Sequence, residues 1–174
     1  VWAYAFLFFE MLAIGYTLFS FVVMLCRTDH RKAADAGERR LRAQGSAVPA
    51  VDIFIATYNE GLDILEKTII AAQAIDYPNF TIWVLDDTRR DGLRDYCAEV
   101  GVQYARRPDN SHAKAGNLNS GLRQSAAASN APYIRVVDAD FAPQQPILFR
   151  ALGRFEDPKV GLEQTRQFCY NPDP

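Results

Sequence analysis

Residues 51–57 read VDIFIAT, a short and almost continuously apolar run that stops at the polar residues Tyr58, Asn59 and Glu60. A run of this length that is apolar on both faces is typical of a strand buried inside a parallel sheet. Comparable runs predict further strands at residues 80–85, 102–105, 133–137 and 160–165.

Helical patterns separate these strands. Leu62, Leu65 and Ile69 recur at helical spacing, and Tyr77-Pro78 ends that pattern. Further helices are predicted at residues 91–100, at residues 113–129 and from Pro146 onward. The alternation predicts an α/β fold, a mostly parallel sheet flanked by helices on both faces. In such sheets, ligands bind beyond the carboxyl ends of the strands.

Polar groups follow four of the predicted strands at that edge. They are Thr57-Tyr58-Asn59-Glu60, Asp86-Asp87, the HAKAGN segment at residues 112–117, and Asp138-Ala139-Asp140. Their positions predict that they meet at one ligand site.

The pair Asp138 and Asp140 is the sharpest of these signals. Two carboxylates separated by one small residue can share a hard cation, and Mg²⁺ or Mn²⁺ held by few carboxylates keeps coordination positions for substrate phosphates. Such a metal neutralises the charge on a leaving diphosphate. An Asx-turn or a helix cap would also explain a lone pair of this kind, but Asp86-Asp87 at an equivalent strand end favours the metal site.

Lys114 is predicted at the start of a helix, behind a cap at Asn110 or Ser111. Taken alone, Lys114 is a solvated first-turn lysine, but helix N-termini attract phosphate and disfavour lysine, so this placement also favours an anionic partner. Tyr58 offers a ring for stacking on a base, and Asp86 or Asp87 could accept a hydrogen bond from a uracil N–H.

The N-terminal residues 1–26 are apolar except for Glu10. About 20 apolar residues in a helix span a bilayer, and the basic residues Arg27, Arg31 and Lys32 that follow predict a cytosolic carboxyl end. Glu10 is costly in lipid, which predicts partner helices. A secretory signal and a buried helix of a soluble protein are the alternatives, and no small-residue cleavage site supports the first.

The predicted organisation is a transmembrane helix at residues 1–26, a cytoplasmic linker or interfacial helix at residues 27–50, and an α/β domain at residues 51–174. The chain starts inside an apolar run and stops in a turn-like stretch, so we expect it to be a piece of a longer protein.

Composition argues against several other classes. The 174 residues carry a formal net charge of −2 without a basic stripe, which disfavours nucleic acid as a partner. The three cysteines form no CxxC motif and complete no zinc pattern, and free thiols fit a reducing compartment. No GxGxxG motif follows the first strand, which disfavours a dinucleotide oxidoreductase.

Five consecutive blocks carry a family likeness: VDIFIATYNE at 51–60, VLDDTRRDG at 84–92, HAKAGNLN at 112–119, VVDADF at 136–141 and EDPKVGLEQTRQFCYNPDP at 156–174. In this order they resemble the cellulose synthase branch of the family-two glycosyltransferases, and HAKAGNLN and FCYNPDP are far more specific than the DxD motif. The resemblance implies a GT-A nucleotide-sugar domain behind a transmembrane helix, with UDP-glucose as donor and a β-1,4-glucan as product of an inverting transfer.

The resemblance also implies residue roles. Thr57, Tyr58 and Glu60 would flank the uridine, Lys114 would lie near the diphosphate, and Asp138 and Asp140 would bind Mg²⁺ or Mn²⁺. Gln164 would lie near the acceptor, in a block that usually reads QTP and here reads Gln164-Thr165-Arg166. The UDP-sugar residues implied are Thr57, Tyr58, Glu60, Asp86, Asp87, Lys114, Asn117 and Asp138.

Two further motifs of the family, TED with the catalytic base and QxxRW at the acceptor, would lie beyond Pro174. We therefore expect no catalytic base within the chain and no sugar transfer by the chain alone. The resemblance implies a bacterial inner-membrane protein with a cytoplasmic catalytic domain. Its implied partners are the growing glucan, membrane lipid, further transmembrane helices and a periplasmic cellulose synthase subunit, and a PilZ domain that binds cyclic di-GMP would also follow.

Two alternatives stay open. The same scaffold could make another polymer, such as curdlan, a mixed-linkage glucan or a mannan. A non-catalytic protein that binds a nucleotide sugar and acts as a scaffold would share the same blocks.

Overall fold

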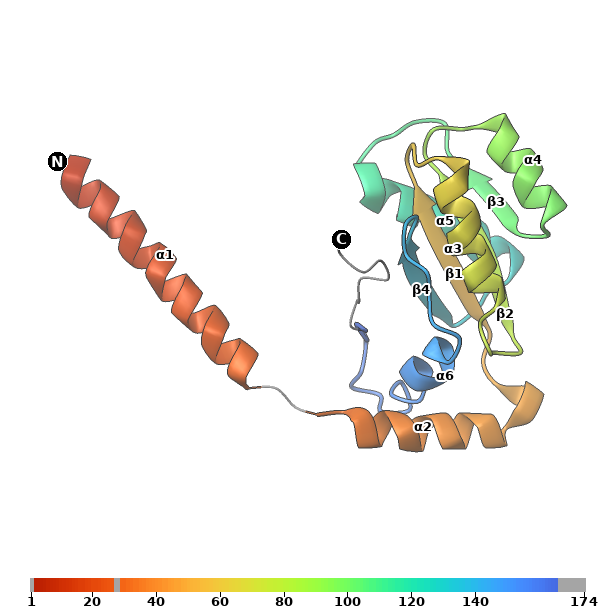
Figure 1. Cartoon of the computed structure of the whole chain (residues 1–174), viewed down its shortest axis with the longest axis horizontal. Helices are drawn as coiled ribbons and strands as arrows, with labels where there is room; N and C mark the ends of the chain where they lie inside the picture. Colours follow the sequence, from red (N-terminus) through yellow and green to blue (C-terminus); the bar gives the residue numbers. More distant parts are fainter. Residues whose placement is uncertain (1, 27–28, 166–174) are drawn as a thin grey trace, which may run out of the picture. The chain divides into compact units, whose positions relative to one another are not determined.

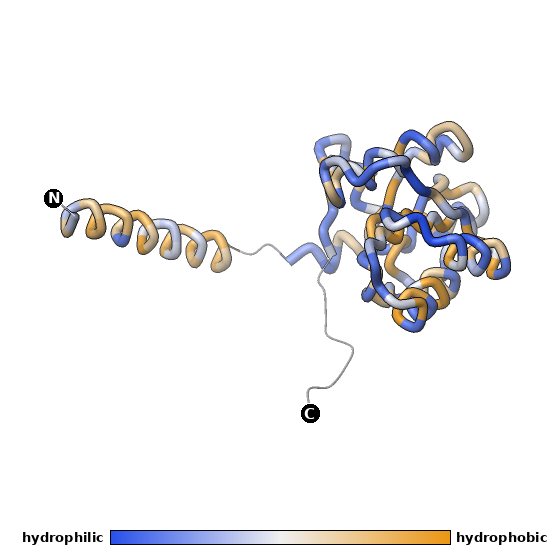
Figure 2. The backbone as a smooth tube through the Cα atoms, turned by 90° about the horizontal axis from the view of Figure 1, so that it is seen from above, coloured by the Kyte–Doolittle hydropathy of each residue, from blue (hydrophilic) through white to orange (hydrophobic). Residues whose placement is uncertain are grey.

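The computed structural model describes residues 2–26 and 29–165. The chain divides into two units, residues 1–32 and residues 33–174. The first unit contains helix α1, Trp2–Leu25, which is apolar around nearly its whole circumference (Figure 2). In the described part of the chain it is the one helix long and apolar enough to cross a membrane. Its hydroxyl groups on Thr17 and Ser20 donate to backbone carbonyls of the helix itself, at 2.8 and 2.9 Å.

Helix α2, Arg31–Ala43, packs against the end of helix α6, Ile147–Leu152, through two glycines. A Cβ atom added to Gly37 would lie 2.7 Å from the Cα atom of Gly153, so the two backbones are in direct contact. Arg150 of α6 pairs with α2 residues Asp35 at 2.9 Å and Glu38 at 3.2 Å. A short 3-10 helix, Gly45–Ala47, then leads into the sheet.

Four parallel strands form one sheet in the order β3-β2-β1-β4 (Figure 1). They are β1 Val51–Thr57, β2 Phe80–Asp86, β3 Gln103–Arg106 and β4 Tyr133–Asp138. In the register, Thr57 pairs with Asp86, Asp86 with Arg106, and Ala56 with Asp138. The strands therefore end almost level, and their carboxyl ends form one edge.

Helices cover both faces of the sheet, which confirms the predicted α/β fold. Helices α3, Leu62–Gln73, and α4, Asp91–Glu99, contribute Leu65, Ile69 and Leu93 to a core with Ile53, Ile55 and Val84. Helix α5, Ala113–Ala128, covers the opposite face over Phe54, Trp83 and Leu85. Gly121 permits this close packing, because a Cβ atom there would lie 2.6 Å from a methyl carbon of Leu85.

The predicted strand at residues 160–165 is wrong, because these residues form no strand. Leu162 is 84% exposed, and the segment is held by side chains instead of a backbone ladder. Glu163 pairs with Arg154 at 3.0 Å, and the hydroxyl of Thr165 accepts a hydrogen bond from Arg135 at 2.9 Å. Strand formation depends on packing against neighbours, which an apolar pattern alone does not supply.

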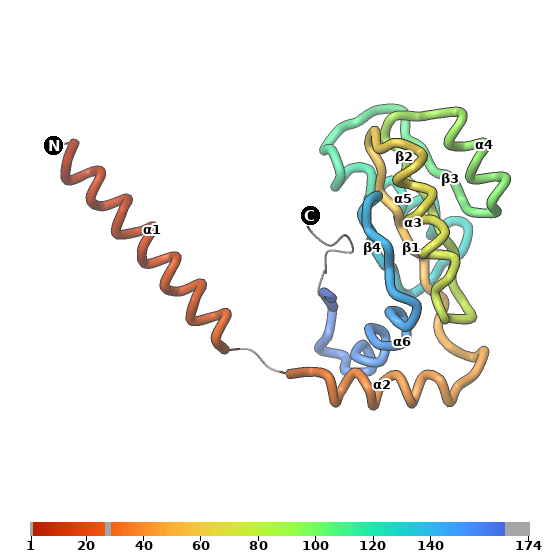
Figure 3. The backbone as a smooth tube through the Cα atoms, viewed as in Figure 1, coloured from red at the N-terminus to blue at the C-terminus, as the bar shows by residue number. Residues whose placement is uncertain are grey.

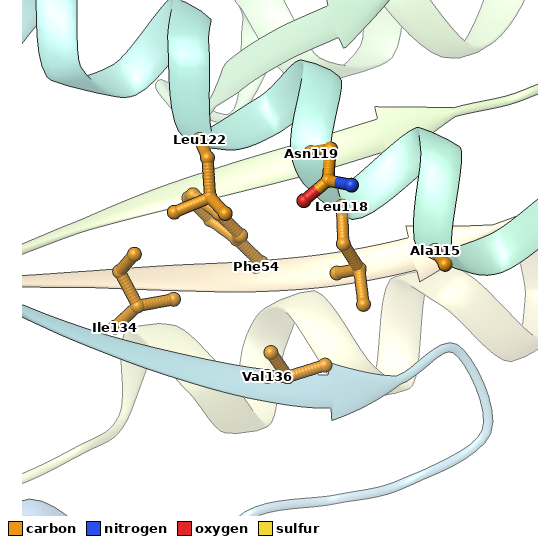
Figure 4. A pocket seen from close by; sticks show the side chains of 7 residues that line it. All are labelled: Phe54, Ala115, Leu118, Asn119, Leu122, Ile134 and Val136. Carbon is orange, nitrogen blue, oxygen red and sulfur yellow. The ribbon is translucent and has the colours of Figure 1, made fainter. Parts of the chain in front are cut away.

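Within the described residues, strand β4 pairs with β1 alone, so its other side is an open edge. Ile134 and Val136 of β4 remain 41% and 42% exposed on the face that carries α5. Between them and α5 lies a groove of about 350 Å³ (Figure 4). Its lining is apolar apart from Asn119, so the groove lacks groups that would recognise a charged ligand.

Candidate functional site

The polar groups predicted from the sequence lie at the carboxyl edge of the sheet. The turn after β1 carries Thr57 to Glu60, and Asp86 and Asp87 end β2. Lys114 lies in the first turn of α5, and Asp138 ends β4 beside Ala56 of β1. The level strand ends bring segments together that lie far apart in the sequence.

Arg90 joins the ends of β1 and β2. Its guanidinium donates to the backbone oxygen of Glu60 at 2.6 Å, to Thr57 Oγ1 at 2.9 Å and to Asp86 Oδ1 at 3.2 Å. The Thr57 hydroxyl in turn donates to Glu60 Oε2 at 2.6 Å, and the Tyr58 N–H donates to the same oxygen at 2.8 Å. The turn is thus stabilised by hydrogen bonds between its own residues, and the Tyr58 side chain remains 62% exposed.

The Glu60 carboxylate is stabilised in its charged form by this turn. Burial alone would raise the pKa of Glu60, but the hydrogen bonds from Thr57 and from the backbone outweigh burial and lower it. Glu60 therefore acts as a fixed hydrogen-bond acceptor that shapes the turn.

Asp86 is fully buried and its carboxylate is saturated with donors. It accepts hydrogen bonds from the Arg90 N–H at 2.6 Å, from the Thr88 hydroxyl at 2.7 Å and from the Tyr104 hydroxyl at 3.0 Å. Burial would raise the pKa of Asp86, but the bonds from the Arg90 backbone and from Thr88 lower it overall. The pKa of Tyr104 is raised, first by burial and then by its bond to Asp86.

Asp87 is also buried, and both of its carboxylate oxygens are bound by Arg107. Arg107 Nε donates to Oδ1 at 2.5 Å and Nη2 donates to Oδ2 at 2.8 Å. This bidentate geometry is the strongest form of an arginine–carboxylate pair. Neither aspartate of the Asp86-Asp87 pair thus faces solvent with a free carboxylate.

Asp138 and Asp140 flank a turn that is held by two hydrogen bonds. The hydroxyl of Thr68 on α3 donates to the Ala139 oxygen at 2.7 Å, and the Phe141 N–H donates to the Asp138 oxygen at 3.1 Å. The chain then runs back along the sheet to α6 (Figure 3). Asp138 forms an ion pair with Lys114, and their side chains stay 45% and 56% exposed. Asp140 is exposed.

The start of α5 differs from the prediction. The residue before its first turn is His112 rather than Asn110 or Ser111, and no side chain caps the helix. Asn110 is engaged elsewhere, because its amide donates to the Asp87 backbone oxygen at 2.7 Å. Asn117 is buried, and its amide donates to the Leu85 oxygen at 2.8 Å, which anchors α5 to β2.

Gln164 is exposed in the segment that follows α6. Arg166 and the FCYNPDP block lie outside the described residues. In residues 2–26 and 29–165, no three or more side chains of the His, Cys, Asp or Glu type gather as a metal cluster. The metal ligands that the sequence predicts are thus two carboxylates, Asp138 and Asp140.

Sequence reasoning missed four residues that shape this edge: Arg90, Arg107, Tyr104 and Thr68. Arg90 lies only four residues after Asp86, in the short connection between β2 and α4, but the helical spacing rule does not apply there and gave no signal. The other three reach partners on distant segments, and no local spacing reveals them.

Comparisons with known proteins show the family of the chain. Residues 52–173 match glycosyl transferase family 2. The chain is 47% identical over 137 residues to the "Cellulose synthase catalytic subunit [UDP-forming]" of Pseudomonas fluorescens (strain SBW25), covering 77% of the chain and 18% of the relative. It is 43% identical over 129 residues to the protein of the same description from Xanthomonas axonopodis pv. citri (strain 306), covering 72% and 17%. It is 41% identical over 129 residues to "Cellulose synthase 1" of Komagataeibacter xylinus, covering 72% and 8%.

Among solved structures, S. aureus TarS aligns with a TM-score of 0.45 and 19% identity, over 55% of this chain and 17% of that one. The chain spans less than a fifth of the length of the three curated relatives named. Because the family match runs through the whole sheet and every polar strand end, the chain belongs to glycosyl transferase family 2.

Proposed function

We propose that the chain is the donor-binding part of a membrane-bound, inverting glycosyltransferase that transfers glucose from UDP-glucose to a β-1,4-glucan. The observation that carries the proposal is the placement of Lys114 beside Asp138, with Asp140 exposed two residues further on. A cation and two accessible carboxylates at one strand end suit a diphosphate with its metal ion. The names of the curated relatives support UDP formation and cellulose as the product.

Asp138 and Asp140 fit a divalent metal ion such as Mg²⁺ or Mn²⁺. Both offer hard carboxylate oxygens on a turn fixed by Thr68, and so few protein ligands leave coordination positions for phosphate oxygens. Magnesium bound by these two residues would supply positive charge to the leaving diphosphate.

The chain's own residues would bind and orient the donor. The exposed ring of Tyr58 would stack on the uracil, while the closed turn of Thr57 and Glu60 fixes its position. Asp86, Asp87 and Asn117 would support the donor-binding edge of the sheet through the hydrogen bonds that hold β2 and α5 in place. Lys114 would donate to the diphosphate and stabilise charge as the bond to the sugar breaks.

The acceptor reaction would draw on segments beyond Pro174. The acceptor hydroxyl would lose its proton to a carboxylate base from such a segment and attack the anomeric carbon, and Gln164 would lie on the acceptor side. We place α1 in the bacterial inner membrane, with the α/β domain in the cytoplasm, because Arg31 and Lys32 follow α1 closely. Further transmembrane helices, membrane lipid, the glucan and a periplasmic subunit would complete the assembly.

The test is UDP binding by the chain in the presence of magnesium, measured by isothermal titration. Asp140→Ala should abolish the magnesium-dependent part of UDP binding while the circular dichroism spectrum stays unchanged. Asp95→Ala, which removes another exposed carboxylate, on α4, is the matched control and should bind like the parent. Unchanged UDP affinity in Asp140→Ala would refute the role of this residue. Linkage analysis of the polymer made by the full-length enzyme separates β-1,4-glucan from curdlan, mixed-linkage glucan and mannan.

A further inference from the structure

One buried guanidinium holds the segment that connects β3 to α5. The Arg107 side chain is only 6% exposed, and its bidentate pair with Asp87 fixes its orientation. The donors left over point to backbone oxygens: Arg107 Nη1 donates to the Ser111 oxygen, and Nη2 donates to the Ala113 oxygen at 3.0 Å. Arg107 thus binds a carboxylate and two carbonyl groups at once.

The two carbonyl groups belong to a strained turn. His112 and Ala113 have φ angles of 62° and 45°, in the left-handed region that residues with side chains rarely adopt. Such conformations persist where the surrounding structure over-determines them. The hydrogen bonds from Arg107 to Ser111 and Ala113 supply that constraint on both sides of His112.

Lys114 follows this turn directly, so the turn sets the direction in which Lys114 leaves the backbone. On the other side of Lys114, the backbone at Gly116 closes over Arg107. A Cβ atom added to Gly116 would lie 2.5 Å from Arg107 Nη1 and would clash with the Ser111 oxygen. Lys114 therefore lies between Ala113 and Gly116, two residues that contact Arg107. Its side chain forms an ion pair with Asp138 at the carboxyl edge of the sheet.

Asp87 is itself fixed at its backbone. Its N–H donates to the Thr57 oxygen at 3.1 Å, and its oxygen accepts from the Asn110 amide at 2.7 Å. A continuous series of hydrogen bonds thus runs from the end of β1 through Asp87 and Arg107 to the turn before α5. Because both carboxylate oxygens of Asp87 are bound to Arg107, we infer that Asp87 acts through Arg107 and does not bind the uracil base of the donor.

We propose that Arg107 is a positioning residue that aims Lys114 at the donor diphosphate, and that Asp87 is the counter-ion that orients Arg107. This inference rests on the proposed function, because it names how the donor-binding edge is built. It assigns no contact between Arg107 and the substrate.

The test is a double-mutant cycle in the full-length enzyme with Arg107→Lys, Lys114→Ala and both together. A lysine keeps the charge of Arg107 but cannot make the bidentate pair and both carbonyl bonds. Each single variant should raise the KM for UDP-glucose at least about tenfold, because the loss of a hydrogen bond to a charged group weakens binding by about that factor or more. The double variant should match the larger single effect, since Lys114 no longer contributes once it is misplaced.

The control is Arg106→Lys, which changes the neighbouring arginine, whose side chain is 50% exposed and pairs with Asp91 at the surface. It should leave KM unchanged. If Arg107→Lys does not fold, Gly116→Ala takes its place in the cycle, because it disturbs the same contacts and keeps both charges.

Effects of the two changes that multiply to about a hundredfold would overturn the inference, as would a folded Arg107→Lys enzyme with normal KM. A wild-type enzyme that transfers no glucose from UDP-glucose would overturn the proposed function, and the inference with it. Transfer by the wild type together with a multiplicative cycle would refute the positioning role alone.

Discussion

Asp86→Asn tests whether the buried carboxylate at the end of β2 has a structural role. Asparagine preserves the shape but offers one acceptor oxygen, so its NH₂ group would face donors that Asp86 now satisfies, among them the Arg90 N–H at 2.6 Å and the Tyr104 hydroxyl at 3.0 Å. The Arg90 guanidinium would also lose its charged partner.

The expected loss follows from these contacts. Removing one partner of a buried ion pair costs about 3–5 kcal/mol, and a hydrogen bond to a charged group contributes about 1.5–3 kcal/mol. Arg90 is 27% exposed and keeps its bonds to Thr57 and Glu60, which places the loss at the lower end. We expect about 3 kcal/mol, which is about 6–12 °C in Tm for a chain of this size.

The assay is urea unfolding followed by tryptophan fluorescence. Trp83 is 6% exposed under α5 and reports the opening of the sheet, whereas Trp2 is already 90% exposed. Asp95→Asn, which alters an exposed pair on α4, is the matched control and should unfold like the parent. A loss below about 1 kcal/mol in Asp86→Asn would refute the structural role and leave Asp86 free to contact a ligand, as the sequence first suggested.

Two further predictions concern pH and packing. Because the pKa values of Asp86 and Glu60 are lowered in the folded chain, their stabilisation is complete above the unfolded values of about 4 and is lost as pH falls through the folded values. The free energy of unfolding should therefore decline below about pH 4, less steeply in Asp86→Asn, and a decline that starts above about pH 6 would contradict this account. Gly153→Val should separate α2 from α6 and speed hydrogen exchange in α2, because any Cβ at Gly153 clashes with the backbone of Gly37. Gly161→Val, with no atom within 4 Å of the added Cβ, is its control, and equal exchange in both variants would count against the contact.

The sheet could be predicted from the sequence because its strands are buried on both faces. Residues 51–57 are apolar at almost every position, and only a strand covered from two sides requires that. The meeting of Lys114 and Asp138 followed as well, since parallel strands place their carboxyl ends at one edge. These inferences use short-range patterns and one topological rule.

The roles of Asp86 and Asp87 could not be predicted in the same way. A carboxylate at a strand end serves a ligand or an arginine, and the outcome depends on which cations the fold brings near. Arg107 reaches Asp87 across 20 residues and Arg90 reaches Thr57 across 33. No periodicity in the sequence links such partners. The sequence therefore suggests where the site lies, and the three-dimensional contacts show which of its residues are exposed to a ligand and which are buried in hydrogen bonds that stabilise the site.

The side of β4 that has no partner strand within residues 2–26 and 29–165 has a practical consequence for work on this chain. Among the described residues β4 pairs with β1 alone, and Ile134 and Val136 are exposed on that strand, so this edge of the sheet can pair with extended segments of other molecules. Concentrated samples would therefore tend toward edge-to-edge strand pairing at β4. Ile134→Lys, near the start of β4, would discourage such pairing while leaving the residues at the carboxyl end of the strand unchanged.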